Sequence, residues 1–225
     1  MSPCVIPHLH GRPARHQRAQ LAPSWKAHLA APLSTEALAA LDDWFGRGRP
    51  AMVCRGAAGD AGAVALSVTL PAARWFATLH FRVGGAAVAR VDPPLPLAEA
   101  IPSAPPGWRD SLTELDRAAA SVGVPLSVVG TLAWQHLAAE PYITPRSTVE
   151  LLFRPGTRRQ LEAILGLLRA REAWDGPPLA GEAVLGWNDA VAWRDLAHGR
   201  RRVMVRSGAN EAVVDVERVL AGLLG

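Results

Sequence analysis

Hydrophobic positions recur along the chain with two different spacings, and these spacings predict its helices and strands. Apolar residues at intervals of three and four follow the N-cap candidates Ser34 and Thr157, which indicates two amphipathic helices. Further helices are predicted at residues 25–30, 111–122, 132–139 and 216–224. Alternation or short apolar runs predict strands at residues 51–55, 63–70, 77–83, 86–91, 125–129, 147–153, 181–186, 190–194 and 202–206. Helices mixed with short strands favour an α+β fold of mixed α/β character.

Glycine and proline residues divide these elements into two groups. Gly84 and Gly85 lie between two predicted strands, and the pair predicts a β-hairpin because glycine adopts positive φ without steric cost. Residues 93–107 are rich in proline and predict an extended connector. We therefore expect an N-terminal α+β domain, residues 1–107, and a second domain with a mixed sheet, residues 108–225.

Residues 1 to about 20 are rich in Pro, His and Arg and lack periodicity, so we expect a partly ordered arm. His8, His10 and His16 lie in this arm, but no fourth ligand at a useful spacing makes them a metal tract. The arm is basic without an apolar core of signal-peptide length, and no apolar run in the sequence is long enough to span a bilayer. These features favour a cytoplasmic protein without a membrane partner.

The chain of 225 residues has a formal net charge of +4, and its positive charge comes almost wholly from arginine, since Lys26 is the single lysine. Arginine suits bidentate contacts with phosphate, although codon use in a GC-rich genome is the simpler explanation. No basic stripe with interleaved aromatic residues is visible, so nucleic-acid binding is not expected. Cys4 and Cys54 form neither a disulfide framework nor a zinc cluster, and we expect free thiols in a reducing compartment.

One stretch combines the features of a phosphate-binding site. The apolar run 124–129 ends at Gly130 and Thr131, where a helical pattern begins. A helix N-terminus presents unpaired N–H groups and the positive end of the helix dipole, so this turn predicts a phosphate cradle. The alternating segment that follows carries Thr148 and Glu150, whose side chains face the same side of a strand.

These features also have a simpler interpretation. Thr148 and Glu150 could be solvent-facing strand residues. Arg146 and Arg154, which flank the segment, could belong to a solvated face. Beside a phosphate cradle, the same two arginines become candidates for triphosphate contacts.

The wider context of this stretch resembles a known family. The sequence GTLAWQHLAAEPYITPRSTVELLFRP, followed by LAGEAVL and then AVAWRDL, is similar to the malonate decarboxylase holo-acyl-carrier-protein synthase family, also called phosphoribosyl-dephospho-CoA transferase. The segments RPARHQRAQLAPSWKAHL and RGRPAMVCR also look like the opening of that family, so the resemblance spans nearly the whole chain. It implies a polymerase-β-like nucleotidyltransferase fold for residues 108–225.

The resemblance implies an enzyme that acts on the malonate decarboxylase acyl-carrier protein. Such an enzyme transfers the phosphoribosyl-dephospho-CoA group from triphosphoribosyl-dephospho-CoA to a serine of the carrier and releases pyrophosphate. The implied cofactor is Mg²⁺, because carboxylates at i and i+2 of a strand can bind the ions that hold a triphosphate. Where the family has two aspartates, this chain has Thr148 and Glu150, and of the family's Asp-Gly-Glu it keeps Glu182 after Ala180 and Gly181.

Carried over residue by residue, these roles define a candidate site. The candidate catalytic residues are Glu150, Thr148 and Glu182, with Glu150 and Glu182 also the candidate metal ligands. One of the two carboxylates would help to deprotonate the serine. The candidate phosphate-binding residues are Gly130, Thr131, Arg146 and Arg154.

Two other hypotheses remain open. Because Thr148 and Ala180 stand where the family has acidic residues, the chain could be a catalytically impaired module of the same fold. Such a module would bind the carrier protein or the CoA precursor without transfer. Alternatively, the same fold could act with a different nucleotide donor.

Overall fold

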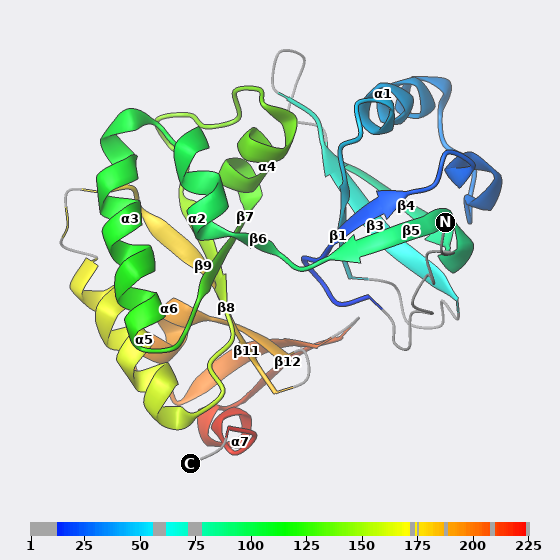
Figure 1. Ribbon diagram of the computed structural model, residues 1–225. Coiled ribbons are helices and arrows are strands. Elements are labelled where there is room, and N and C mark those ends of the chain that lie inside the picture. Colours follow the sequence, from blue (N-terminus) through cyan, green and yellow to red (C-terminus); the bar gives the residue numbers. More distant parts are fainter. Residues whose placement is uncertain are drawn as a thin grey trace, which may run out of the picture.

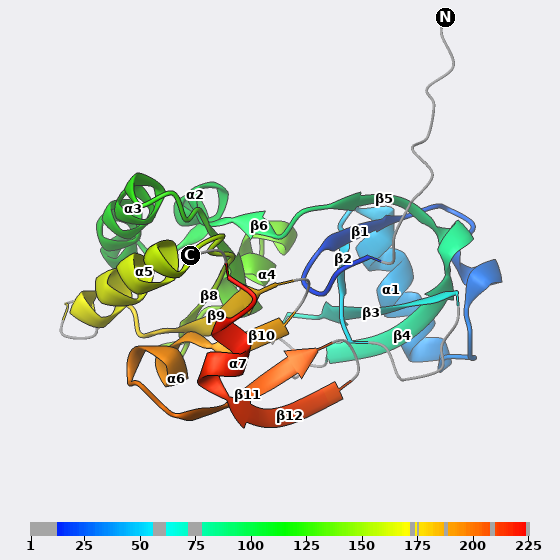
Figure 2. The same cartoon turned by 90° about the horizontal axis from the view of Figure 1, so that it is seen from below.

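The chain folds around two β-sheets, each with its own hydrophobic core, in a computed structural model that describes residues 13–55, 62–71, 78–171, 174, 176–186, 189–207 and 210–223. The first sheet with α1 lies at one end of the molecule, and the second sheet with its helices lies at the other (Figures 1 and 2). Cys4, His8 and His10 lie outside the described residues. The expected α+β class is confirmed.

The first sheet is antiparallel, and its strands are ordered β4-β3-β2-β1-β5. They are β1 (Arg18–Leu21), β2 (Ala51–Val53), β3 (Ala63–Thr69), β4 (Thr78–Gly84) and β5 (Val88–Asp92). Two helices, η1 (Trp25–His28) and α1 (Thr35–Gly46), bury Trp25, Leu41 and Trp44 in the core of this sheet. The predicted N-cap is confirmed, because Ser34 Oγ accepts a hydrogen bond from the Ala37 N–H at 3.2 Å.

The hairpin predicted at Gly84 and Gly85 is wrong. β4 pairs with β3 and β5 pairs with β1, so the strands on either side of these glycines lie at opposite edges of the sheet. Only η3 (Gly85–Ala87) separates them along the chain, so the two edges approach each other at this end. A glycine pair indicates a turn, but it does not reveal that β5 has a partner far earlier in the sequence.

That partner lies in the segment expected to be a partly ordered arm. β1 is an interior strand, hydrogen-bonded to β2 on one side and to β5 on the other. The expectation is therefore wrong for residues 18–21. Pairing on both sides satisfies the backbone of β1, and this requires no apolar periodicity in its sequence.

The second sheet is mixed, with its strands ordered β12-β11-β10-β9-β8-β7-β6. They are β6 (Leu95–Pro96), β7 (Leu126–Val129), β8 (Val149–Phe153), β9 (Leu179–Leu185), β10 (Asp189–Ala192), β11 (Arg202–Ser207) and β12 (Asn210–Asp215). Among the described strands, β8 and β9 form the one parallel pair. β12 was not predicted, because its side chains are mostly exposed and give no alternating pattern.

Helices cover one face of this sheet. They are α2 (Leu97–Ala100), α3 (Pro106–Ser121), α4 (Gly130–Ala138), α5 (Arg158–Arg171), α6 (Trp193–Ala197) and α7 (Val216–Leu220). The predicted cap of α5 is confirmed, because Thr157 Oγ1 accepts a hydrogen bond from the Gln160 N–H at 3.1 Å. Alternate residues of β8, Val149, Leu151 and Phe153, point into the helix-covered core. The residues between them therefore face the opposite side, toward the first sheet.

The extended connector predicted for residues 93–107 is wrong. This segment forms β6, α2, η4 (Ile101–Ser103) and the start of α3, and it buries Leu95, Leu97, Ala100 and Ala104 in the second core. Pro96 occupies an edge strand, and Pro102 and Pro106 occupy the first turns of helices, where no backbone N–H is needed. The predicted strand 190–194 is also too long, because Trp193 and Arg194 begin α6.

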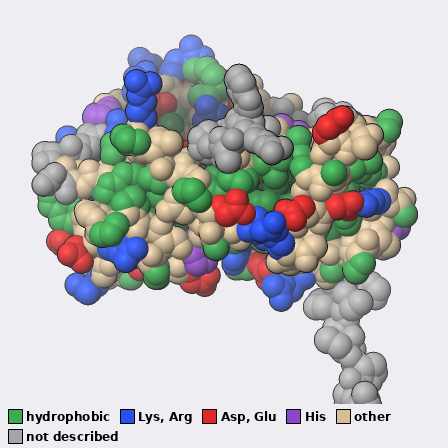
Figure 3. All heavy atoms as spheres, turned by 90° about the horizontal axis from the view of Figure 1, so that it is seen from above, with side chains coloured by type: hydrophobic (Ala, Val, Ile, Leu, Met, Phe, Trp, Pro, Cys, Tyr) green, Lys and Arg blue, Asp and Glu red, His purple; other side chains and the backbone are tan. Residues whose placement is uncertain are grey.

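Helix α4 joins the two cores. Leu132 and Ala133 belong to the second core, whereas Trp134 and Ala138 belong to the first. The ring of Trp134 packs edge-on against that of Trp44, with 5.7 Å between centroids. No helix in the described part of the chain is both long enough and apolar enough to cross a membrane. On the face shown in Figure 3, acidic and basic side chains of the described residues are interspersed.

Candidate active site

The open face of the second sheet forms the floor of a cavity of about 490 Å³. The neighbouring strands β7 to β11 line it together with Thr148, which directly precedes β8, and the segment before β1 covers them. Residues from both sources line the cavity, among them Arg15, His16, Thr148, Glu150, Ala180, Glu182, Ala192 and Arg206. The cavity thus contains all three candidate catalytic residues, Thr148, Glu150 and Glu182.

Strand register explains why the two glutamates meet. Glu150 lies on β8 opposite Ala180 of β9, and Leu152 lies opposite Glu182. Residues two apart on a strand share a face, so Glu150 and Glu182 project from the same side of adjacent strands. Glu182 is also paired with Ala192 on β10, and a small side chain there leaves space above the sheet.

Two glycines permit this arrangement. Gly130 has a φ of 67°, and a Cβ at this position would lie 2.7 Å from Cδ of Glu150. Gly181 has a φ of 119°, and a Cβ there would collide with the backbone of Leu151 on β8. At both positions there is no room for a Cβ, and φ has a positive value that residues other than glycine rarely adopt, so glycine is needed at each. The turn predicted to cradle phosphate therefore lies directly against the Glu150 carboxylate.

Thr131 follows Gly130 in the first turn of α4. Its Oγ1 is buried and has no hydrogen-bond partner among the described residues. A buried hydroxyl without a hydrogen-bond partner costs about 1–3 kcal/mol, so an unpaired hydroxyl next to a candidate site requires an explanation.

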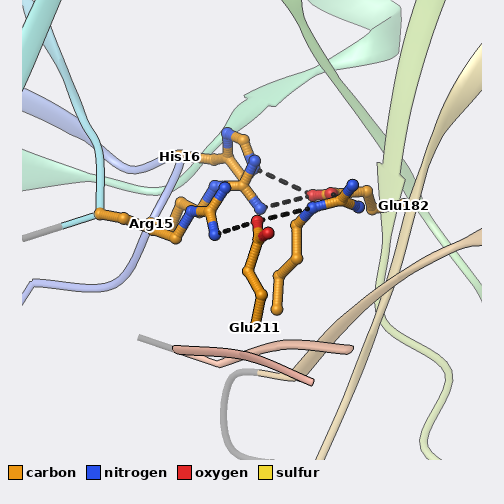
Figure 4. A network of polar contacts seen from close by, with 6 residues as sticks. Arg15, His16, Glu182 and Glu211 are labelled. Carbon is orange, nitrogen blue, oxygen red and sulfur yellow. Dashed lines mark hydrogen bonds and ion pairs between the residues drawn. The ribbon is translucent and has the colours of Figure 1, made fainter. Parts of the chain in front are cut away.

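Glu182 is the centre of a cationic cluster (Figure 4). Arg15 Nη1 donates to Oε2 at 2.7 Å, and Arg206 Nη1 donates to Oε1 at 3.1 Å. His16 Nε2 lies 3.4 Å from Oε2. Burial alone would raise the pKa of Glu182, but the hydrogen bond with His16 and the charges of Arg15, His16 and Arg206 outweigh it and lower the pKa to about 2. Glu182 is therefore ionised at neutral pH.

The cluster extends to both sheets. Glu211 on β12 contacts Arg206 at 3.3 Å and also pairs with Arg55, which follows β2 of the first sheet. Each guanidinium carries five N–H donors, so these ion pairs leave donors that can bind a further anion. Arg15 and Arg206 both line the cavity.

Glu150 has a different environment from Glu182. No described residue donates a hydrogen bond to its carboxylate. Burial raises the pKa of Glu150, and so does the nearby charge of Glu182, while His16 and Arg15 act in the opposite direction. The two carboxylates thus have pKa values shifted in opposite directions, a common feature of acid–base sites.

The two arginines predicted to contact phosphate lie elsewhere. Arg146 is exposed in the loop before β8, where its N–H is bonded to Thr144 Oγ1. Arg154 is exposed after β8, and its Nη1 donates to the Gly186 carbonyl at 2.9 Å. Neither is among the residues that line the cavity of Glu150 and Glu182.

Arg15, His16 and Arg206 occupy that cavity instead, and sequence reasoning missed them. The one available signal was the similarity of the stretch around Arg15 and His16 to the opening of the family. Local pattern gives no indication that this stretch reaches the second sheet. As for metal ligands, the described residues contain no group of three or more His, Cys, Asp or Glu placed to hold an ion.

Known proteins match the chain over both sheets. The sequence model of the phosphoribosyl-dephospho-CoA transferase MdcG N-terminal domain matches residues 14–94, and that of the C-terminal domain matches residues 96–217. A phosphoribosyl-dephospho-CoA transferase of Xanthomonas campestris pv. campestris is 34% identical over 74% of this chain and 78% of its own length. A phosphoribosyl-dephospho-CoA transferase of Xanthomonas euvesicatoria pv. vesicatoria is 34% identical over 74% of this chain and 79% of its own length.

The similarity to another relative extends over the full length. A phosphoribosyl-dephospho-CoA transferase of Bradyrhizobium diazoefficiens is 29% identical over 100% of this chain and 99% of its own length. No solved structure matches the chain significantly. Matches to both domain models and to relatives of similar length show that this transferase belongs to the phosphoribosyl-dephospho-CoA transferase family.

Proposed function

We propose that the chain transfers the phosphoribosyl-dephospho-CoA group from triphosphoribosyl-dephospho-CoA to a serine of the malonate decarboxylase acyl-carrier protein. The serine oxygen forms a bond to the α-phosphorus, the bond from that phosphorus to the bridging oxygen breaks, and pyrophosphate leaves. The observation that carries this proposal is the cavity itself. It combines an unpaired carboxylate, Glu150, with a carboxylate, Glu182, that holds two guanidinium groups.

Glu150 is the group that accepts the serine proton. A general base needs a pKa closer to neutrality than that of an ordinary carboxyl, and the environment of Glu150 moves its pKa in that direction. Glu182 is unsuited to this role because its low pKa makes it a weak base. It acts by orienting Arg15 and Arg206.

The triphosphate binds to the guanidinium groups of Arg15 and Arg206. Guanidinium forms bidentate, charge-assisted bonds with phosphate oxygens, and these bonds stabilise the charge that develops on the leaving pyrophosphate. The Gly130 turn, which lies against Glu150 at the N-terminus of α4, offers backbone N–H groups to the same phosphates. Arg15 and Arg206 replace Arg146 and Arg154 in this role because they share the cavity with the carboxylates.

The oxygen ligands in the cavity fit one Mg²⁺ rather than the two ions that a pair of aspartates would hold. Mg²⁺ is usually held by one or two carboxylates together with substrate phosphates, and it supplies charge neutralisation of the triphosphate when bound. The hydroxyl of Thr148 and one oxygen of the Glu150 carboxylate would hold it, which leaves the other oxygen of Glu150 to accept the serine proton. Glu182 is already surrounded by cationic side chains, which oppose the approach of a second ion.

The alternative is a module that binds the carrier or the precursor without transfer. It is favoured by Thr148 and Ala180, which stand where the family has acidic residues. Reconstitution distinguishes the two functions: apo-carrier protein, triphosphoribosyl-dephospho-CoA, Mg²⁺ and the chain are incubated, and the intact mass of the carrier is measured. The transferase predicts a mass gain with the wild-type chain. No gain with the wild type, together with a gain when Thr148→Asp is used, would establish the impaired module instead.

A further inference from the structure

A second cavity adjoins the one that holds the carboxylates. Its volume is about 310 Å³, and it lies between residues 14–17 and the same open face of the second sheet. It shares Arg15, His16 and Leu152 with the first cavity. Nothing in the transfer chemistry described above uses it.

The strands place the two cavities side by side. On β7, β9 and β10, each residue that lines the second cavity is two positions away from one that lines the first. The pairs are Ser127 with Val129, Val184 with Glu182, and Ala190 with Ala192. Two residues along a strand span roughly 7 Å, so a single ligand can reach from one cavity into the other.

The chemistry of the two cavities differs. The second is walled mainly by apolar side chains, including Pro94, Pro125, Leu152 and Val184. Leu152 and Val184 are buried and form a small cluster with Val129 on this face. Polar groups of Ser127, Gln17 and Arg154 are also present at its wall. A ligand that occupies both cavities therefore has a strongly anionic end and a largely apolar one.

We propose that this second cavity binds the adenine nucleoside of the dephospho-CoA portion of the donor. This inference rests on the proposed function, since it places the donor's triphosphate in the neighbouring cavity. The faces of a purine ring are apolar and its edge is polar, which fits apolar walls with a few hydrogen-bonding groups. Guanidinium groups stack well on such rings, and Arg15 and Arg154 both lie at the wall.

Size and the stacking of guanidinium on a purine ring favour the nucleoside over the pantetheine arm. A cavity of about 310 Å³ lies at the small end of ligand sites, and it accommodates one nucleoside rather than the whole donor. The pantetheine arm has no aromatic ring on which the guanidinium groups at the wall could stack. The arm is therefore expected to extend out of the cavity.

Two alanines on β10 provide a matched pair of variants. Ala190 and Ala192 project from the same face of the strand, but Ala190 lines the second cavity and Ala192 the first. Binding of dephospho-CoA, AMP and inorganic triphosphate to the full chain is measured by calorimetry. Ala190→Leu should weaken dephospho-CoA and AMP by about tenfold or more, and change triphosphate binding by less than about twofold. Ala192→Leu should do the reverse.

Several results would overturn the assignment. The first is that dephospho-CoA does not bind the wild type saturably. The second is that both variants weaken the binding of dephospho-CoA equally. The third is that 4′-phosphopantetheine displaces dephospho-CoA but AMP does not. If Ala190→Leu does not fold, 8-azido-AMP photolabelling of the wild-type chain decides instead. Label in peptides containing residues 125–127, 152–154 or 184–190 supports the site, and label confined elsewhere refutes it. These assays use no carrier protein, so their failure is distinguishable from failure of transfer.

Discussion

Arg15, which precedes the first strand of the N-terminal sheet, donates a 2.7 Å hydrogen bond to Glu182 on β9 of the other sheet. The bond connects the two halves of the molecule at the site of the proposed reaction. It also means that the residues before β1 complete the cavity of the second domain. The N-terminal half therefore contributes side chains to this cavity.

The coupling between Arg15 and Glu182 is measurable by a double-mutant cycle. Arg15→Ala, Glu182→Ala and the double variant are unfolded in urea, and the interaction free energy is taken from the non-additivity. We expect coupling on the order of 1–3 kcal/mol because the pair is largely buried and charged.

The matched control is the exposed pair of Arg158 and Glu217, which are 3.4 Å apart. Its coupling should be below about 0.5 kcal/mol, because solvent screens exposed pairs. Equal coupling in the two cycles would show that the Arg15–Glu182 contact is no stronger than a surface pair.

Glu150→Gln tests the assignment of the general base. The variant keeps the shape of the side chain but cannot accept a proton, so we expect transfer to slow by about 10²–10⁴-fold. Stability should not fall, because burial already disfavours the charged form of Glu150. Activity is followed by carrier mass and stability by thermal unfolding. Glu162→Gln, an exposed change on α5, is the control and should leave both unchanged.

Gly130→Ala should be destabilising as well as inactivating. An added Cβ would meet the carboxylate of Glu150 on a backbone with a φ of 67°, so we expect a loss of about 1–3 kcal/mol in unfolding free energy. Gly166→Ala is the matched control, because Gly166 lies in the middle of α5 and a Cβ there meets nothing within 4 Å. That change should stabilise by about 0.5–1 kcal/mol. A Gly130→Ala protein with full stability and activity would contradict the account of this turn.

Acid unfolding should depend on Glu182. Its pKa is about 2 in the folded protein against an ordinary value of 4.5, so the ionised form is favoured by folding. A carboxyl whose pKa is lower in the folded than in the unfolded protein stabilises the fold when the pH is above the unfolded value, here 4.5. This contribution, on the order of 3 kcal/mol, is lost as the pH falls from the unfolded pKa to the folded pKa of about 2. The difference in unfolding free energy between wild type and Glu182→Gln should therefore shrink between about pH 5 and pH 2. A difference that stays constant over this range would show that ionisation of Glu182 does not stabilise the fold.

Local signals predicted much of the fold, and long-range pairing accounts for what they missed. The caps at Ser34 and Thr157 and the alternation in β8 depend on neighbouring residues, so the sequence alone reveals them. The interior position of β1 depends on β5, which lies far along the chain. The proline-rich segment after β5 was misread because an edge strand and helix starts tolerate proline.

At the candidate site, too, some residues were predicted from the sequence and others were found only in the structure. Glu150, Thr148 and Glu182 were identified through family resemblance, and the structure brings them into one cavity. Arg15 and Arg206 were missed because their sequence neighbours indicate nothing about the opposite sheet. Only the folded chain shows that these two arginines share Glu182.

The most direct test of the account measures carrier modification and pyrophosphate release together. Wild-type chain, apo-carrier protein, triphosphoribosyl-dephospho-CoA and Mg²⁺ are mixed, and intact mass and pyrophosphate are followed in one sample. The account predicts equimolar mass gain and pyrophosphate, with the modification on a single serine and both products lost with Glu150→Gln. Pyrophosphate released without modification of the carrier, or modification undiminished in Glu150→Gln, would contradict it.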